Sequence, residues 1–181
     1  SSMVTEFIYW SDYYNSIISP FYSYSTGRTK ETLRSSQVTC RDIDDDGYIE
    51  IPEDTSSKKQ SSEITSQNWV NYGNTVLSHK CYSFSCKRDG YILVIDDDDF
   101  SKVKANYDSE SRKLTIINKK NKSNVFEIVT LINSNYSVND PKYKDYTMIM
   151  KNSGFVYLAK VNKSSDIDIN IQTLKDMIKV Y

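Results

Sequence analysis

The residues best suited to chemistry in this chain are carboxylates that share one short loop. Three aspartates at alternate positions precede a glycine, and two glutamates follow at the ninth and twelfth positions of the same loop. Carboxylates in this spacing can converge on one hard cation, and a backbone carbonyl between them offers a further oxygen. The pattern predicts calcium as the cofactor, with these metal ligands: Asp42, Asp44, Asp46, the carbonyl of Tyr48, Glu50 and Glu53.

The residues that follow this loop favour a strand rather than a helix. Ile49 and Ile51 flank a polar residue, and Pro52 lacks the N–H that a helix interior needs. We therefore expect the loop to lie between strands, unlike the helix-loop-helix type of calcium site. The alternative is an Asp-rich turn whose carboxylates are solvated and hold no cation.

Other groups of reactive residues fit known sites less well. Residues 96–99 are four contiguous aspartates, and because contiguous side chains do not converge, we expect a solvated turn there. The spacing of the zinc-type ligands matches no small zinc module; these residues are His79, Cys40, Cys81 and Cys86. We expect the three cysteines to be free thiols, buried as small apolar groups.

Templates for catalysis are missing from the sequence. The chain contains no G-x-S-x-G elbow, no G-x-x-x-x-G-K phosphate loop and no H-E-x-x-H helix, and its single histidine is His79. Nothing in the sequence places that histidine beside a nucleophile. We therefore expect no enzyme activity. The alternative is an extracellular hydrolase, or an accessory domain of one, with two carboxylates about 5–10 Å apart across a cleft.

The composition describes a polar, globular chain of 181 residues. Hydrophobic residues make up 38% and charged residues 26%, while 15 tyrosines supply much of the area that a core can bury. The formal net charge of -1 argues against a nucleic-acid partner, because such proteins carry a basic patch. No apolar run approaches the roughly 18 residues that a spanning helix needs.

Alternating apolar residues between polar turns predict a series of antiparallel strands that must position the acidic loop. At the C-terminus apolar residues recur at helical spacing from Ile171 to Tyr181, and Asn170 is suited to cap a helix there. The fold class we predict is α+β: an antiparallel β-meander sheet with a C-terminal helix packed on one face and an N-terminal β segment attached. The expected strands are residues 4–10, 91–95, 114–117, 125–132, 146–150 and 155–161.

A polar segment divides the chain into three parts. Residues 55–66 contain almost no large apolar groups, which is typical of a linker. Residues 1–54 form an N-terminal β segment that is too short to bury a core of its own. Residues 67–181 form the predicted C-terminal α+β domain.

Several short motifs resemble a set of uncharacterised clostridial-type lipoproteins of the Firmicutes. In these proteins, repeats similar to the FG-GAP and VCBS β-propeller type precede a C-terminal α+β region. The motifs are VTEFIYW at residues 4–10, SPFY at 19–22, RSSQVTC at 34–40, DIDDDGYIEIP at 42–52, WVNY at 69–72, DGY at 89–91, GFVYLAK at 154–160, and the closing helix from Asn170.

The resemblance implies a secreted protein, anchored to the membrane by a lipid on a cysteine upstream of this chain, and no established activity. It makes residues 1–54 the end of a propeller-like repeat region, whose metal positions would be Asp42, Asp44, Asp46 and Glu50. We expect a non-catalytic module at the cell surface that binds a protein, a glycan or an ion, with no nucleic-acid partner. A cytoplasmic interaction domain is the remaining alternative, favoured by the free cysteines and by the lack of a signal segment at the start.

Overall fold

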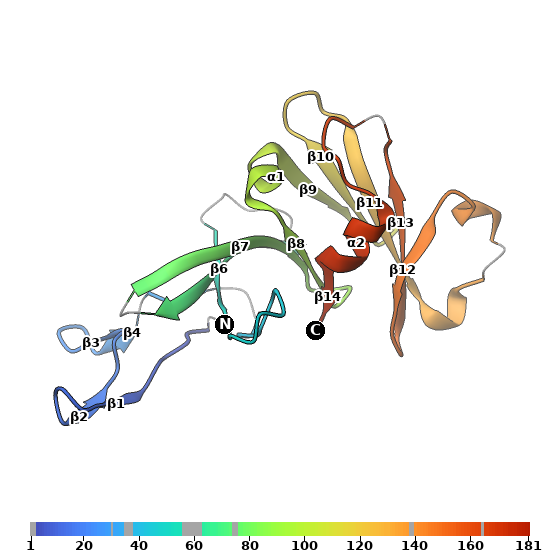
Figure 1. Ribbon diagram of the computed structural model, residues 1–181. Coiled ribbons are helices and arrows are strands. Elements are labelled where there is room, and N and C mark those ends of the chain that lie inside the picture. Colours follow the sequence, from blue (N-terminus) through green and yellow to red (C-terminus); the bar gives the residue numbers. More distant parts are fainter. Residues whose placement is uncertain are drawn as a thin grey trace. The chain divides into compact units, whose positions relative to one another are not determined.

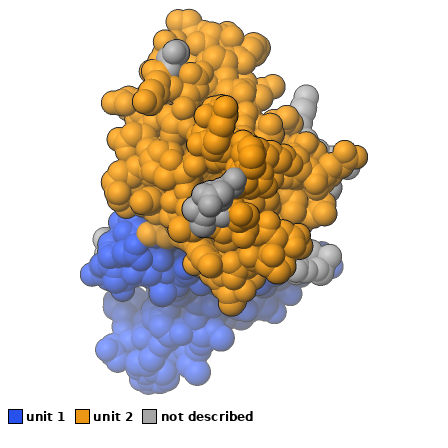
Figure 2. Space-filling view, turned by 90° about the vertical axis from the view of Figure 1, so that its right-hand side faces the viewer, with its two compact units in different colours: residues 1–56, 67–81 blue, residues 57–66, 82–181 orange. Residues whose placement is uncertain are grey.

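The computed structural model describes residues 3–29, 31–34, 38–55, 63–73, 76–137, 140–163 and 165–181, and Figure 1 labels its elements. Contacts divide the chain into two compact units (Figure 2). Unit 1 contains residues 1–56 and 67–81, and unit 2 contains residues 57–66 and 82–181. Of the predicted linker at 55–66, residues 56–62 lie outside the described residues. The division into residues 1–54 and 67–181 stays a prediction.

Unit 1 consists of short hairpins and part of a larger sheet. β1 pairs with β2, β3 pairs with β4, and β5 pairs with residues 67–70 of β6, in each case antiparallel. The strands that contribute to this unit are β1 (Tyr9–Ser11), β2 (Ser16–Ile18), β3 (Tyr22–Ser23), β4 (Arg28–Thr29), β5 (Ile51–Asp54), β6 (Ile64–Gly73) and β7 (Val76–Cys86).

A small aromatic core holds unit 1 together. Phe21, Ile51 and Val70 are buried, and the rings of Phe7 and Tyr72 pack against them. The ring of Phe21 makes edge contacts, with centroids 5.5 Å from Phe7 and 5.1 Å from Tyr72. This packing joins the N-terminal segment to β5 and β6, the strands next to the acidic loop.

The strand predicted for residues 4–10 is mostly wrong, because only Tyr9 and Trp10 belong to β1. The N–H of Thr5 donates to Oγ1 of Thr32 at 2.8 Å, and that hydroxyl donates to the carbonyl of Thr5. A side chain therefore satisfies the backbone groups that a neighbouring strand would otherwise bind.

Unit 2 contains the remaining strands: β8 (Tyr91–Ile95), β9 (Val103–Asp108), β10 (Lys113–Asn118), β11 (Asn124–Ile132), β12 (Thr147–Lys151), β13 (Phe155–Val161) and β14 (Ile178–Val180). One sheet has the order β12-β13-β11-β10-β9, and a second has the order β14-β8-β7-β6-β5 (Figure 1). Strands β9, β10 and β11 form a meander, in which β10 and β11 correspond to the expected strands at residues 114–117 and 125–132, whereas β9 is not among the expected strands. The meander is then interrupted, because β13 lies between β11 and β12.

Apolar side chains from both sheets form one core in unit 2. Phe84 and Leu93 of the second sheet pack in the same cluster as Leu114, Ile128 and Tyr157 of the first. The uninterrupted apolar run at residues 91–95 predicts a strand covered on both faces. The structure confirms this strand as β8, in which four of five side chains are buried.

The predicted α+β class is wrong, because the fold is mainly β. Across the described residues, strands account for 49% and helical segments for 12%, in four antiparallel sheets with two short α-helices. These helices are α1 (Asp97–Lys102) and α2 (Ile171–Met177), and single 3-10 turns occur at η1 (Asn133–Asn135) and η2 (Pro141–Tyr143). The sheets, rather than a helix, supply most of the core.

The C-terminal helix is shorter than its apolar spacing predicts. Asn170 caps it as expected, and its side chain accepts a hydrogen bond from the N–H of Thr173 at 3.0 Å. The helix ends at Met177 because residues 178–180 form β14 and pair with residues 91–93 of β8. Pairing with a distant strand therefore overrides the local helical pattern.

Candidate metal centre

The acidic loop is closed at its base by backbone hydrogen bonds. Arg41 and Glu50 form an isolated antiparallel bridge, with N–H to carbonyl distances of 3.1 and 2.9 Å. Between them, Asp45 and Gly47 have φ angles of 63° and 91°, which let the chain reverse within a few residues. Ile43 is fully buried and anchors the loop in unit 1.

The carboxylate of Asp42 organises the loop from within. Its Oδ1 accepts a hydrogen bond from the N–H of Asp46 at 3.0 Å, and its Oδ2 accepts one from the N–H of Gly47 at 2.8 Å. Such a bond from an aspartate to backbone N–H groups further along a turn is a local interaction, so the sequence of the loop itself encodes the curve.

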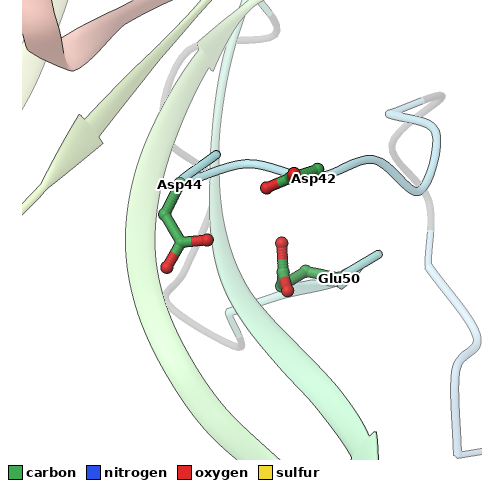
Figure 3. Close-up of side chains that lie close together, drawn as sticks. All are labelled: Asp42, Asp44 and Glu50. Carbon is green, nitrogen blue, oxygen red and sulfur yellow. The ribbon is translucent and has the colours of Figure 1, made fainter. Parts of the chain in front are cut away.

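Three carboxylates converge inside this loop (Figure 3). Asp42, Asp44 and Glu50 each offer one oxygen, and these three oxygens lie within 4.8 Å of one another. Figure 3 shows the carboxyl group of Glu50 directed toward Asp42, with an oxygen of Asp44 facing the same space. Among the described residues this is the group of three or more His, Cys, Asp or Glu side chains that can share a metal ion.

Glu50 is the unusual member of this group, because it is fully buried. Its Oε2 accepts a hydrogen bond from the N–H of Ile43 at 2.9 Å, whereas its buried Oε1 has no hydrogen-bond partner. Burial raises the pKa of the Glu50 carboxyl, the Ile43 bond partly offsets the rise, and the nearby aspartate charges add to it. A buried oxygen without a partner is costly, and a bound cation would satisfy it.

Two of the other predicted ligands, Asp46 and Glu53, are not members of this cluster. Asp46 accepts a hydrogen bond from the N–H of Tyr48 at 2.9 Å. The carbonyl of Tyr48 stays a predicted ligand. Glu53 lies on β5, where it accepts a hydrogen bond from Nδ2 of Asn68 at 3.2 Å, and burial raises the pKa of its carboxyl. The structure therefore brings together the first, third and ninth positions of the loop.

Sequence reasoning missed Lys80, which lies on β7. Its Nζ forms ion pairs with Oδ2 of Asp44 at 3.0 Å and with Oδ2 of Asp46 at 2.5 Å. Hydrogen bonds to Asp46 and Asp44 raise the pKa of the Lys80 ammonium, and the hydrogen bond from Lys80 lowers the pKa of Asp46. No pattern near the loop signals this partner, because it is 34 residues from Asp46 and reaches it only through the order of the sheet.

The donor set has the chemistry of a hard-cation site. Carboxylate oxygens on an irregular loop suit Ca²⁺, which accepts flexible oxygen coordination, better than zinc, which prefers sulfur and nitrogen. The three cysteines are free thiols, as expected, but only Cys86 is buried, whereas Cys40 and Cys81 are partly exposed. Burial and the charge of Asp89 raise the pKa of the Cys86 thiol to about 12, so it is not a thiolate ligand near neutral pH.

Three pockets lined by described residues contain at most one carboxylate each. A pocket beside β11 and β13 contains Glu127, and one beside the turn after β10 contains Asp166. A third pocket, beside Tyr143, contains no carboxylate. Two acids facing each other, as hydrolysis would require, do not occur in these three pockets.

No family model, curated protein or solved structure matches this chain. The resemblance to clostridial-type lipoproteins therefore stays a prediction. In the part of the chain that the structure describes, no helix has the length and apolar character to cross a membrane. The function is therefore inferred from the chemistry of the acidic loop.

Proposed function

We propose that residues 42–50 bind calcium in a non-catalytic, extracytoplasmic binding module. The observation that carries the proposal is the buried carboxylate of Glu50: its Oε1 has no hydrogen-bond partner, and one of its oxygens clusters with oxygens of Asp42 and Asp44. Three carboxylates held close together repel one another, and a divalent cation between them removes both the repulsion and the unsatisfied oxygen.

Calcium binding would hold the backbone in place where the loop leads into β5. Glu50 ends the loop and β5 begins at the next residue, Ile51, which is part of the core of unit 1. A cation that joins Glu50 to Asp42 and Asp44 therefore ties both ends of the loop to the packed strands. The role we propose for the metal is structural, with water and backbone oxygens completing its coordination.

A partner at the cell surface, either a protein or a glycan, is part of the same proposal. Unit 1 carries large aromatic side chains that are well exposed, including Trp10 at 57%, Tyr13 at 88% and Tyr24 at 83%. Aromatic side chains are enriched where proteins bind partners, because they bury a large area with few rotatable bonds. The extracytoplasmic location rests on the family resemblance together with a calcium site of this kind.

Calorimetric titration with calcium tests the proposal, using Glu50→Gln and Glu53→Gln as a matched pair. Both changes replace a glutamate by its amide within four residues of each other, but only Glu50 belongs to the cluster. We expect saturable binding in the unchanged protein and in Glu53→Gln, and loss of binding in Glu50→Gln. No binding at millimolar calcium, or binding that survives Glu50→Gln, would overturn the proposal.

A further inference from the structure

Lys80 already supplies a positive charge to the acidic loop. Its ammonium bridges Asp44 and Asp46 at 3.0 and 2.5 Å, and all three side chains are 30% exposed. Lysine carries a compact charge on a flexible four-carbon stem, so this group can leave the loop without moving its strand. The loop therefore contains a built-in cation at two of the three alternating aspartates.

Asp44 belongs to two groups at once. One of its carboxylate oxygens contributes to the cluster with Asp42 and Glu50, while Oδ2 is bound by Lys80. A divalent ion in the cluster and the ammonium on the same carboxylate would be like charges a few ångströms apart. Even with the dielectric constant of water, repulsion across about 6 Å weakens binding roughly tenfold.

We propose that Lys80 is an internal counter-ion that competes with the divalent cation for Asp44 and Asp46, and so sets the affinity of the loop. This inference rests on the proposed function. Without the metal, the ammonium neutralises the two aspartates and holds the loop in shape. When the metal binds, the ammonium moves to solvent and frees Asp46 to join the coordination.

The exchange also favours divalent over monovalent ions. A sodium ion carries no more charge than the ammonium that it would replace, and it lacks the covalent tether that keeps Lys80 near the loop. A calcium ion brings twice the charge to a site with three carboxylates, one of them buried. Lys80 therefore raises the cation concentration that is needed to occupy the loop, and only a divalent cation can displace it.

The test is a calorimetric titration of the full chain with calcium alone, at fixed ionic strength. Lys80→Gln removes the charge and should bind calcium about tenfold more tightly than the unchanged protein. Lys80→Arg keeps the charge and should stay within about threefold of it. Lys102→Gln is the matched control, because it removes a lysine that pairs with an aspartate in unit 2, at 3.1 Å from Asp99, and should change nothing.

A second measurement uses the unchanged protein and needs no variant to fold. Labelling of lysine amines by an acylating reagent, read by mass spectrometry, should increase at Lys80 when calcium is added, while labelling of Lys102 stays constant.

Two results would overturn this inference and leave the proposed function standing. One is calcium binding by the unchanged protein that Lys80→Gln does not strengthen, and the other is Lys80 labelling that calcium does not increase. Binding by Lys80→Gln alone overturns the proposed function, because the unchanged protein then holds no calcium, and it overturns the inference that rests on that function. Binding by neither protein overturns the proposed function and the inference with it.

Discussion

Asp89 shows how a single buried charge is accommodated in unit 2. Its carboxylate is fully buried and forms an ion pair with Nη2 of Arg112 at 2.6 Å. The hydroxyl of Tyr107 donates to Oδ2 at 2.9 Å, and Sγ of Cys86 lies 3.6 Å from the same oxygen. The backbone carbonyl of Asp89 accepts a hydrogen bond from the hydroxyl of Tyr157 at 2.8 Å. One residue therefore joins the turn after β7 to β9, to β13 and to the turn before β10.

Replacing Asp89 should strongly destabilise the protein. In Asp89→Asn the guanidinium of Arg112, whose side chain is only 19% exposed, loses its charged partner. Breaking a buried pair from one side costs about 3–5 kcal/mol, and we expect a loss near the lower end because Arg112 is partly solvated. Urea unfolding measures it. Asp145→Asn, which removes an exposed pair with Lys160, is the control and should change stability by less than about 1 kcal/mol. Equal effects of the two changes would contradict the role of Asp89.

Helix α2 shows what a short element requires from its ends. It has seven residues, and Leu174 is its one fully buried side chain, so little of its stability comes from length. Asn170 satisfies the N–H of Thr173 at its start, and β14 begins immediately after its last residue. Both ends of the helix are therefore fixed by interactions outside its own hydrogen-bond ladder.

Removing the cap of α2 should cost about 1 kcal/mol of stability. Asn170→Ala leaves the N–H of Thr173 without its side-chain partner, whereas Asn170→Asp keeps an acceptor and adds a charge that the helix start favours. We expect urea unfolding to show the loss in the alanine variant and stability close to that of the unchanged protein in the aspartate variant. An alanine variant as stable as the aspartate variant would show that the cap contributes nothing.

These elements also show which features the sequence could predict. The strand at residues 91–95 and the cap at Asn170 follow from local patterns, and both are confirmed. The curve that gathers Asp42 and Asp44 is also local, since Asp42 binds the N–H groups of its own loop. The end of α2 and the position of Lys80 depend on strand pairing between distant segments, which local sequence patterns do not reveal. Glu53 lies away from the cluster for the same reason, because β5 pairs with β6.

At the scale of the whole molecule, the two units differ in how they are stabilised. Unit 2 has an extensive apolar core drawn from the first sheet and from the part of the second sheet that belongs to this unit. Unit 1 has a small aromatic core and exposes several large apolar side chains, including Ile8 at 69% and Ile17 at 65%. Stability is therefore unevenly distributed, and unit 1 is the part that a bound cation can stabilise most.

Calcium should slow hydrogen exchange in unit 1 and leave unit 2 unchanged. A ligand at 100 times its dissociation constant raises the free energy of unfolding by about 2.7 kcal/mol. This corresponds to roughly 100-fold slower exchange for amides that exchange by unfolding. We expect this protection in peptides covering residues 38–54, and none in peptides covering residues 103–118. Removing the metal with a chelator should reverse it. Protection confined to unit 2 would contradict a site in the acidic loop.

The register shift in β12 has a consequence for how copies of this protein behave in concentrated solution. β12 lies at the edge of its sheet, and its pairing with β13 shifts between Met148 and Met150. A regular, apolar edge would offer its free backbone groups to the same strand of another copy and seed edge-to-edge association. The register shift interrupts the regular row of free backbone groups with which another copy would pair, and the exposed charge of Lys151 at the end of the strand also opposes pairing. The protein thereby carries its own protection against aggregation at this edge.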